Sequence, residues 1–477
     1  MNVDFSLFIP EFTMAGVALL VMAADLFLRE ERKHWLAYLA LAGILGAIAT
    51  VFPVAGEDAE QYGGLFLIDR YAAFFKIFLL TAGASMVLAS VEHVRVKLTH
   101  PGEFYGLLLF SILAMMAMVS AGELLTAYIS LELFSFCLYI LAGYNFTRPK
   151  SVEAGIKYIL IGAFSSAMLL YGISLIYGAT GTTVFAEIAA ALDSGADSQI
   201  ALVAGIVLVL VGFGFKVTAV PFHMWAPDVY EGAPTPVTGY LAVVSKAVSF
   251  ALLLRLFSLA FGPALDDWRP IVAGLAAASI LLGNLVATAQ ANIKRMLAYS
   301  SIGNAGYLLM GIAAFSPLAA NGLVFHLIGY SAANFAVFAC VIAYENLTGK
   351  ELIDDFKGLA KRQPFLALVM SAGMFSLAGL PVFAGFATKF YLFTAAADAG
   401  LLWLVIIATL GSLVSLYYYL MVIKAIYMEE PAEGAPLRLT LPIGGVVAAL
   451  GFATLFFGVY PGPMLTLIEQ ATRALGL

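Results

Sequence analysis

The stretch that decides the fold is IALVAGIVLVLVGFGFKVTAVPFHMW, residues 200–225. Its first sixteen residues carry no charged side chain. A run of this kind predicts a transmembrane helix, because a hydrocarbon core about 30 Å thick is crossed by roughly 20 apolar residues in helical form. Lys216 and Pro221 follow within the same run, so we expect this helix to be interrupted and to carry a charge inside the membrane.

The same apolar pattern recurs along the whole chain. Of 477 residues, 62% are hydrophobic and only 11% are charged, whereas a soluble domain carries about 25% charged residues. The sequence therefore predicts an all-α integral membrane protein without a soluble domain of any size. We expect about fourteen transmembrane helices, at residues 5–28, 35–53, 66–90, 104–121, 124–145, 153–178, 200–225, 237–260, 270–291, 296–315, 318–345, 365–395, 399–427 and 438–461.

Composition also narrows the function. The net charge of −6 comes with no cluster of lysine and arginine, which argues against a nucleic-acid partner. Cys137 and Cys340 are the only cysteines, too few for an iron–sulfur cluster, and no dinucleotide, phosphate-loop or metal motif is present. We expect no cofactor or metal in this chain. The first apolar run contains Pro10 and Glu11 and is interpreted as a spanning helix rather than a removable signal peptide.

The positively charged residues predict the orientation. An even number of helices places both termini on one side, and the positive-inside rule selects that side. With the termini outside, the inner connections hold fifteen cations and the outer segments hold three. The fifteen are Arg29, Arg32, Lys33, Arg95, Lys97, Arg148, Lys150, Lys294, Arg295, Lys350, Lys357, Lys361, Arg362, Lys424 and Arg438, and the three are Arg70, Arg269 and Arg473.

An internal similarity suggests two repeats. LIGAFSSA at 160–167 resembles LIGYSAA at 327–333, five helices later. A five-helix unit must be inverted when it is repeated, and inverted repeats recur in ion-coupled transporters. We therefore expect one membrane domain, 1–477, comprising a three-helix segment (1–103), a first repeat (104–260), a second repeat (270–427) and a C-terminal helix (438–477).

The repeat pairs the seventh helix with the twelfth, and both contain residues that break helices. They are Gly212, Gly214 and Pro221 in the seventh, and Gly379, Pro381 and Gly385 in the twelfth. Interruptions at corresponding positions indicate an ion pathway, because freed backbone groups must face protein or water. Glycine and proline are also commoner in membrane helices generally.

Four ionisable residues lie deep in the predicted spans: Glu132, Lys216, Lys246 and Lys389. Each charge at mid-bilayer costs about 2.5–3.5 kcal/mol on insertion scales, so we expect them to face the bundle interior, to pair, or to be hydrated. The alternative is snorkelling, in which a long side chain reaches the headgroups. Snorkelling suits Lys76, Lys157, Arg255 and Lys424, but it suits Lys246 poorly.

Buried lysine and glutamate suit proton transfer. Burial favours their neutral forms and mutual pairing favours their charged forms, so a Glu132–Lys216 pair that opens and closes would bind and release protons. A lone buried pair could also simply fix helix packing, but four such residues favour a functional role. His223 is seven residues after Lys216 and would share its helix face if the helix continues past Pro221. It is a candidate relay, as is His326, although a merely hydrogen-bonded histidine is an equal alternative for both.

A longer string carries a resemblance. GFGFKVTAVPFHMWAPDVYEGAPTPV at 212–237 resembles the N subunits of respiratory complex I, the proton-translocating NADH–quinone oxidoreductase. The part at 220–235 is closer to the N subunits than to their sisters L and M. LPVFAGFATKF at 380–390 and SLEL at 130–133 fit the same family, and the resemblance extends over essentially the whole chain.

The resemblance implies an antiporter-like fold of fourteen helices, with inverted five-helix repeats and broken seventh and twelfth helices. It implies that Glu132 and Lys216 form the coupling pair, that Lys246 is the central relay and that Lys389 lies on the exit side. Glu153 and Lys157 match further charged positions of the family. Asn304 stands where members often have histidine after Ser-Ser-Ile-x, which favours a water chain anchored by Asn304 over a histidine relay there.

The resemblance also implies an assembly. The chain would be a proton-translocating membrane-arm subunit in a bacterial inner membrane, with both termini periplasmic. Its neighbours would be subunit M and small membrane subunits, while FMN, iron–sulfur clusters and quinone would be bound by other subunits. Two alternatives stay open: a subunit of a multi-subunit cation–proton antiporter, and a scaffold subunit that pumps nothing.

Overall fold

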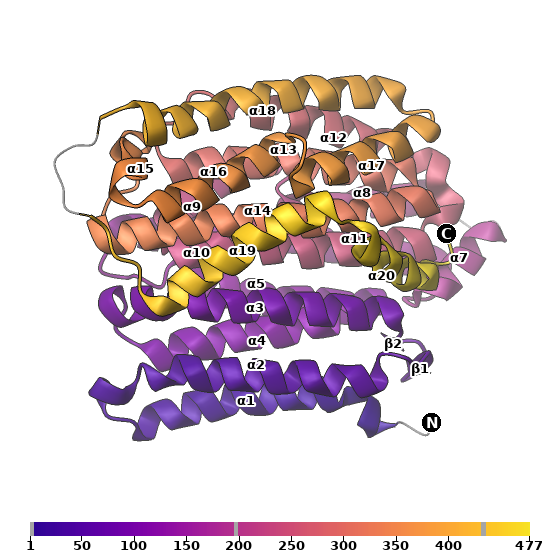
Figure 1. Cartoon of the computed structure of the whole chain (residues 1–477). Coiled ribbons are helices and arrows are strands. Elements are labelled where there is room, and N and C mark those ends of the chain that lie inside the picture. The colour runs from indigo at the N-terminus through magenta and orange to yellow at the C-terminus, as the bar shows by residue number, and fades with distance from the viewer. Residues whose placement is uncertain (1–3, 195–198, 431–435) are drawn as a thin grey trace.

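The computed structural model describes residues 4–194, 199–430 and 436–477. In these ranges the chain is almost entirely helical, and the long helices run side by side along one direction (Figure 1). Twelve of them are long and apolar enough to cross a membrane, which confirms a multi-pass, all-helical protein. The first and last described residues lie at the same end of the bundle (Figure 1).

The first half of the chain forms one side of the bundle. Proline in the first turn opens α4 and α6, where a missing backbone N–H is harmless, and Asp69 caps α3 by accepting from the Ala72 amide. The elements are η1 Phe5–Phe8, α1 Ile9–Phe27, α2 Trp35–Val51, β1 Ala59–Gln61, β2 Phe66–Ile68, α3 Arg70–Lys97, α4 Pro101–Val119, α5 Leu124–Ala142, α6 Pro149–Thr180, α7 Phe185–Asp193, α8 Gln199–Val217, α9 Ala226–Gly232, α10 Thr235–Tyr240, the π-helical turn η4 Leu241–Ser245 and α11 Lys246–Leu259.

The second half forms the other side. Asn292 and Ser316 cap α13 and α14 with their side-chain oxygens. The elements are α12 Leu265–Ala287, α13 Ile293–Ala314, α14 Pro317–Thr348, α15 Leu359–Arg362, α16 Pro364–Ala378, α17 Ala384–Asp398, α18 Leu402–Met428, α19 Leu441–Val459 and α20 Gly462–Thr472.

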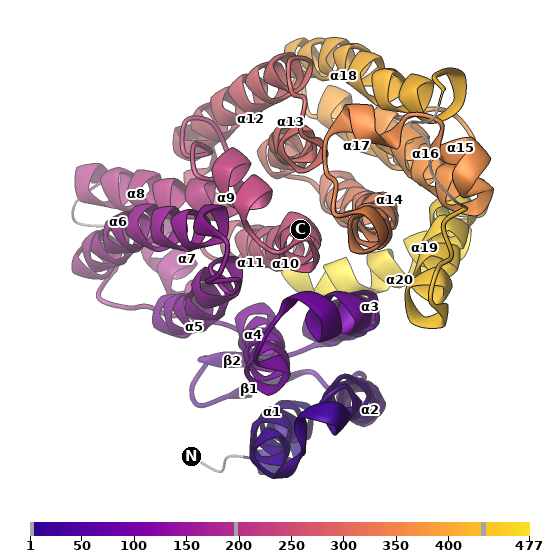
Figure 2. The same cartoon turned by 90° about the vertical axis from the view of Figure 1, so that its left-hand side faces the viewer.

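Two spans occupy the centre of the bundle. In the end view, α10–α11 and α14 lie near the middle of the bundle, α13 lies inward of α12 and α18, and α1 and α2 lie at the edge (Figure 2). The most apolar windows of Thr235–Leu259 and Pro317–Thr348 are entirely buried. Polar residues on these two spans therefore face protein and not lipid. Any charged pathway through the bundle is expected to run along them.

Two spans are interrupted at the expected places. The chain leaves α8 at Val217 and resumes a helix at Ala226, and it leaves α16 at Ala378 and resumes at Ala384. Pro221 lies in the first gap, and Gly379 opens the second with a φ of +88°, which glycine adopts without steric cost. The expectation for Gly212 and Gly214 was wrong. Both lie inside continuous α8, where a Cβ would come within 2.6 Å of the Leu169 Cβ or of the Phe222 ring, respectively, so both serve close packing.

Snorkelling was the wrong interpretation for two residues. Lys76 is 2% exposed and binds Glu11 at 2.6 Å. Arg255 is fully buried, and its Nη2 donates to both Asp69 carboxylate oxygens at 2.7 and 2.8 Å. Carboxylates on other helices compensate these charges, which no feature of the local sequence reveals. Lys157 and Lys424 are part-exposed, as snorkelling requires.

Several elements were not predicted. The β1–β2 hairpin pairs Glu60 with Leu67, so α3 begins at Arg70 and not at 66. The amphipathic helices α7 and α20 lie where the sequence suggested only connections. The π-helical turn η4 directly precedes Lys246, and such turns frequently mark functional positions within helices.

Candidate functional site

Lys216 lies one residue before the end of α8 and is 3% exposed. Its ammonium donates to the hydroxyls of Ser135 and, at 3.3 Å, Tyr139, both on α5. The rings of Tyr139 and Phe215 lie 5.1 and 5.2 Å from the Nζ atom, within the range of cation–π attraction. Hydroxyls and ring faces thus surround the ammonium, and within the described residues no carboxylate lies within 4.0 Å of it.

Glu132 lies three residues before Ser135 and is half-buried. Its Oε1 accepts a hydrogen bond from the Ser166 hydroxyl of α6. Residues three apart share a helix face, so the carboxylate and the hydroxyl that binds Lys216 lie on the same side of α5. The expected Glu132–Lys216 pair is therefore adjacent but not closed in this structure.

Lys246 is 1% exposed and is the first residue of α11. Its Nζ donates to the Val217 carbonyl at 2.9 Å and to the Thr218 Oγ1 at 2.5 Å. The exposed carbonyls at a helix C-terminus carry partial negative charge, so the interruption after α8 provides an acceptor for this cation. Lys216 lies in the last turn of α8, and Lys246 of α11 binds the carbonyl of its last residue. Both lysines therefore lie at the C-terminal end of α8.

Lys389, on α17, repeats this arrangement at the second interruption. It is 5% exposed, and its Nζ donates to the Leu377 carbonyl at 2.9 Å and to the Ser412 Oγ at 3.0 Å. The ring of Tyr307 lies 4.9 Å away. At each interruption, the ammonium group of a buried lysine thus binds a carbonyl at the end of the helix. These carbonyls have lost their helical partners, and leaving them unpaired in a membrane would be costly.

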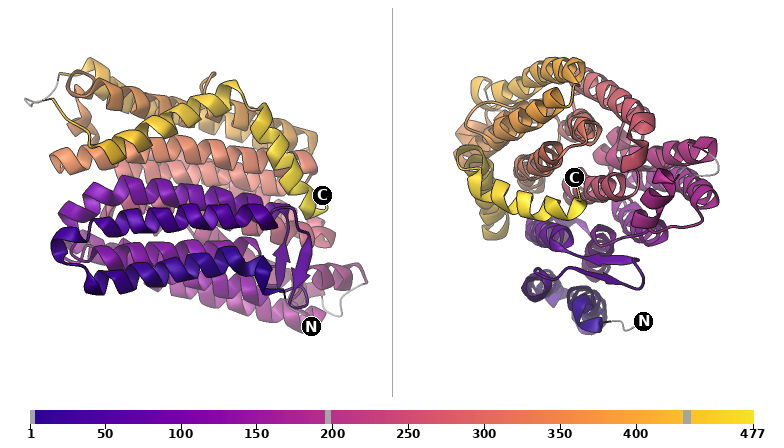
Figure 3. Two further views of the ribbon diagram at one scale, coloured as in Figure 1. Left: turned by 60° about the horizontal axis from the view of Figure 1, so that its bottom comes forward. Right: turned by 90° about the vertical axis from the view of Figure 1, so that its right-hand side faces the viewer.

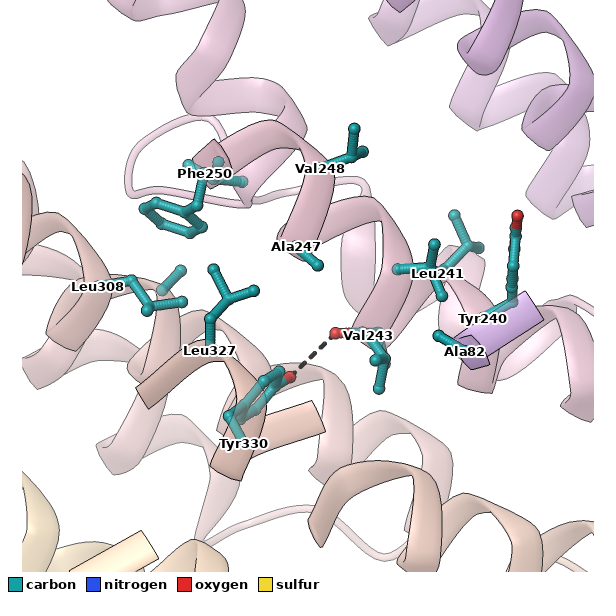
Figure 4. Packing of buried hydrophobic residues seen from close by; sticks show 14 of the residues in the cluster. Ala82, Tyr240, Leu241, Val243, Ala247, Val248, Phe250, Leu308, Leu327 and Tyr330 are labelled. Carbon is teal, nitrogen blue, oxygen red and sulfur yellow. Dashed lines mark hydrogen bonds between the residues drawn. The ribbon is translucent and has the colours of Figure 1, made fainter. Parts of the chain in front are cut away.

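Tyr330 of α14 connects the two halves. Its hydroxyl bonds with the Ala242 carbonyl of η4 at 3.1 Å and the Ser301 Oγ at 2.9 Å, and it accepts from Asn334 at 2.5 Å. Figure 4 shows its side chain reaching toward the chain beside Val243, among apolar neighbours. Tyr330 and Lys389 also line one narrow internal cavity, which has no room for a water molecule in this structure. Polar groups therefore extend from the turn before Lys246 to Lys389.

Asn304 and His326 line the same cavity. Asn304 donates to the Ser300 carbonyl at 2.9 Å, and the Nδ1 of His326 bonds with the Thr388 Oγ1 at 3.0 Å. The Nε2 of His326 and the Oδ1 of Asn334 are buried and have no protein partner. Buried polar atoms are normally hydrogen-bonded, to water if not to protein, so a local opening of the packing would let water bind these two atoms.

His223 lies in the turn between α8 and α9 and is half-buried. The expected shared face with Lys216 required a continuous helix, and that condition fails because α8 ends at Val217. The carbonyl of His223 instead accepts from the Ala226 amide, while its Nδ1 is buried without a partner. The structure thus does not bring His223 into line with Lys216 along one helix.

Glu153 and Lys157 belong to a separate network at one end of the bundle. Lys157 lies 2.6 Å from both Glu153 and Asp228, and Arg295 lies 2.6 Å from Asp228. The network ties α6 to α9 and α13. Its side chains are about one-third exposed or more, so its stabilising effect is that of surface ion pairs, and its charges are accessible to water.

Sequence reasoning missed several partners of the lysines. Ser135 and Tyr139 follow Glu132 at intervals of three and seven residues, and this helical spacing is a signal that could have found them. Ser412, the partner of Lys389 on α18, lies on another helix and carries no such signal. Among the described residues, no group of three or more histidine, cysteine, aspartate or glutamate side chains is arranged to hold a metal.

Comparison with known proteins decides the family. Residues 121–415 match the family of NADH:quinone oxidoreductase and Mrp antiporter transmembrane subunits, a range that contains all four intramembrane residues predicted above. NADH-quinone oxidoreductase subunit N of Moorella thermoacetica is 44% identical over 95% of both chains. This chain belongs to the NADH-quinone oxidoreductase subunit N family.

Solved structures agree with that assignment. A chain of respiratory complex I from Thermus thermophilus is 32% identical, with a TM-score of 0.82, over 97% of this chain and all of that one. A chain of the Mrp complex from Dietzia sp. covers 99% of this chain and 98% of that one with a TM-score of 0.85, at 23% identity. The second likeness shows a shared antiporter-like fold only.

Gly385→Ala is expected to disturb the second interruption in this subunit N family member. A Cβ at Gly385 would lie 1.7 Å from the Ser376 carbonyl oxygen. The obstacle is backbone and not a flexible side chain, so α16 and α17 must move apart, at a penalty of about 1–3 kcal/mol for overpacking. We expect a lower thermal midpoint of the purified protein. Gly46→Ala on α2 is the control, because nothing lies within 4 Å there, and equal midpoints for the two variants would contradict the prediction.

Proposed function

We propose that this chain translocates protons across the membrane through Glu132, Lys216, Lys246 and Lys389, as the antiporter-like subunit of an NADH–quinone oxidoreductase. The observation that carries the proposal is that three lysines are buried among hydroxyls and carbonyls, with no carboxylate within 4.0 Å in the described residues. A packing role would be served by closed ion pairs, as in Lys76–Glu11, whereas these three lysines are held by neutral acceptors.

Pairing governs the proton. A nearby carboxylate favours the charged form of a lysine, and its withdrawal favours release of the proton. Glu132 is held by Ser166 in this structure, while Lys216 is held by Ser135 on the same helix. A rotation of the Glu132 side chain from Ser166 toward Ser135 would close the pair. Opening and closing this pair is the step by which Glu132 would load and unload Lys216.

The proton then has a polar route. Lys216 and Lys246 meet the same helix end, because Lys246 binds the carbonyl of the residue after Lys216. Tyr330 and Asn334 continue from η4 toward the cavity of Lys389, and His326 and Asn304 line that cavity. We propose that this cavity widens during proton transfer and that water then bridges these groups. Asn304 would anchor water there, because an amide donates and accepts hydrogen bonds without carrying a proton.

The finer architecture belongs to the same proposal. Adding α13 and the interrupted pair α16–α17 to the twelve candidate spans gives fourteen spans. We propose two inverted five-helix repeats, within 104–260 and 270–427, preceded by the segment 1–103 and followed by 438–477. The recurrence of a lysine-bound interruption in α8 and α16 supports this organisation.

The surroundings of the chain are proposed from charge and surface. The fifteen-to-three distribution of cations supports termini on the periplasmic side of a bacterial inner membrane. Glu132 borders Leu133, Phe136 and Ile140, which are 43–52% exposed, and this apolar face suits a neighbouring subunit such as M or a small membrane subunit.

FMN, iron–sulfur clusters and quinone would be bound by other subunits and would supply the redox energy. His223, Glu153 and Lys157 are proposed for proton uptake at the bundle end.

The experiment is purification of the whole complex through an affinity tag on this chain, followed by reconstitution into vesicles. We expect flavin- and iron–sulfur-containing partners to co-purify, and NADH oxidation with a quinone to drive proton uptake that an uncoupler abolishes. Co-purification with antiporter subunits alone, and ion exchange without NADH, would favour the cation–proton antiporter instead. A scaffold role is tested by the Lys246 variants below.

A further inference from the structure

An apolar groove outside the proposed pathway lies between α3, α14 and the pair α19–α20. In Figure 1, α19 rises toward the middle of the picture and α20 descends toward the C-terminus, so that the two form an arch. The left view of Figure 3 shows the same bend. Leu450 and Phe457 of α19 and Met464 and Leu467 of α20 line the groove, which has a volume of about 920 Å³. This is at the upper end of the roughly 300–1,000 Å³ of small-molecule pockets.

Among the described residues, the hydroxyls in the interior of the groove already donate their hydrogen bonds. Phe74, Ile77 and Phe78 of α3 are among its apolar walls. The hydroxyls that line it, on Thr81, Ser85 and Ser331, each donate to a carbonyl four residues earlier in their own helix, at 2.8, 3.0 and 2.6 Å. Ordered water needs two to four polar partners and would find few here. An aliphatic chain fits these walls.

The mouth of the groove is charged. Arg70, the first residue of α3, and Gln470 both line it and are exposed. Within the described residues, Arg70 has no carboxylate within 4.0 Å, and a guanidinium binds phosphate bidentately. Gly56 also lines the groove, and the next two residues, Glu57 and Asp58, are exposed and likewise have no ion-pair partner. A cation thus lines the opening, and two carboxylates follow the lining residue Gly56 directly in the chain.

The dimensions match a lipid. From Arg70 to Ser85 the groove follows α3 for about 22 Å, at 1.5 Å per residue, whereas one leaflet of the hydrocarbon core is about 15 Å deep. The groove therefore runs from the headgroup level into the membrane interior. A helix of a partner protein, about 10 Å wide, would occupy roughly 1,700 Å³ over the same length. This exceeds the volume of the groove, about 920 Å³, so such a helix would not fit inside it.

We propose that the groove binds one zwitterionic aminophospholipid of the phosphatidylethanolamine type. Arg70 binds the phosphate, the ammonium faces Glu57 and Asp58, and the acyl chains lie along Phe74 and Phe78 beneath the arch. The second apolar groove, between α16 and α18, is a weaker candidate, because its Lys424 already lies 3.8 Å from Glu429. The bound lipid would join the N-terminal helices to α14 and α19.

The test uses the intact complex in vesicles that contain phosphatidylethanolamine with a photoreactive acyl chain. After illumination, mass spectrometry locates the adducts. We expect adducts concentrated on α3, α14 and α19 facing the groove, and at least threefold more labelling than with a phosphatidylglycerol probe. Labelling by phosphatidylglycerol that equals or exceeds it would overturn the headgroup assignment.

Two variants sharpen the test. Ala453→Trp fills the groove and Arg70→Gln removes the phosphate ligand, and we expect each to lower groove labelling at least fivefold. Ala23→Trp, on the exposed face of α1, and Arg473→Gln, which does not line the groove, should leave it unchanged. Adducts spread evenly over all lipid-facing helices, or a neighbouring subunit cross-linked into the groove, would overturn the proposal.

Discussion

Lys246→Met is expected to reduce NADH-driven proton uptake by roughly 10²-fold, the lower end of what a positioned acid–base group contributes, without preventing assembly. Methionine has an unbranched chain of similar length but neither charge nor proton. Among the described residues, Lys246 binds the Val217 carbonyl and the Thr218 hydroxyl and no carboxylate, so the substitution leaves none of their carboxylates without its partner. NADH oxidation should fall together with proton uptake if this subunit couples the two.

Lys246→Arg separates charge from proton transfer. Arginine keeps the positive charge near the carbonyls of α8, but it does not release its proton in proteins. We therefore expect the same loss of proton uptake in an assembled complex. Lys424→Met is the control, because that side chain is 54% exposed near the end of α18. A full proton stoichiometry per NADH in either Lys246 variant would refute the pathway and favour a scaffold role.

Asp69→Asn is expected to destabilise the protein by about 3–5 kcal/mol, the usual effect of removing one partner of a buried ion pair. Arg255 is fully buried, and both Asp69 oxygens accept from it. The ring of Tyr71 lies 4.8 Å from the guanidinium but cannot replace a carboxylate. Asparagine can still cap a helix, so the variant keeps the cap of α3. Any loss of stability is then caused by the loss of the negative charge.

The thermal midpoint of the purified complex and the amount of assembled protein measure this effect. The double variant Asp69→Asn with Arg255→Leu is the control, because it keeps the cap of α3 and removes the buried cation that Asp69→Asn alone leaves without a carboxylate. We expect the double variant to recover most of the lost stability. If the single and double variants are equally destabilised, the ion pair is not the source. Since Arg255 is nine residues after Lys246 on α11, the single variant should also impair proton uptake.

Composition and periodicity predicted much of the fold correctly. The apolar runs located the long helices because a bilayer admits few alternatives: a spanning segment must satisfy its own backbone, and a helix does so. Pro221 and Gly379 marked the two interruptions for the same reason, since proline removes a donor and glycine admits a positive φ. The prediction was weaker at element ends, as at β2, where an apolar segment forms a strand instead.

The candidate site was only partly visible in the sequence. Glu132, Lys216, Lys246 and Lys389 stand out because ionisable residues are expensive in apolar spans. Their partners do not, because carbonyls such as that of Val217 have no sequence signature. Arg255 and Lys76 illustrate the opposite failure: both seemed suited to snorkelling, and distant carboxylates on α3 and α1 instead hold them inside.

By itself, the sequence determined that this protein is a membrane protein. It also determined which segments form the long helices and which few charged residues lie within them. Those conclusions follow from local costs, which depend on the residue and its immediate neighbours. Only the tertiary structure decided that the ends of α8 and α16 each receive a lysine, that Glu132 stands apart from Lys216, and that Tyr330 links the halves. The physical reason is that a buried charge is compensated by whatever polar group packing brings within about 3 Å, and packing joins residues that are far apart in the chain.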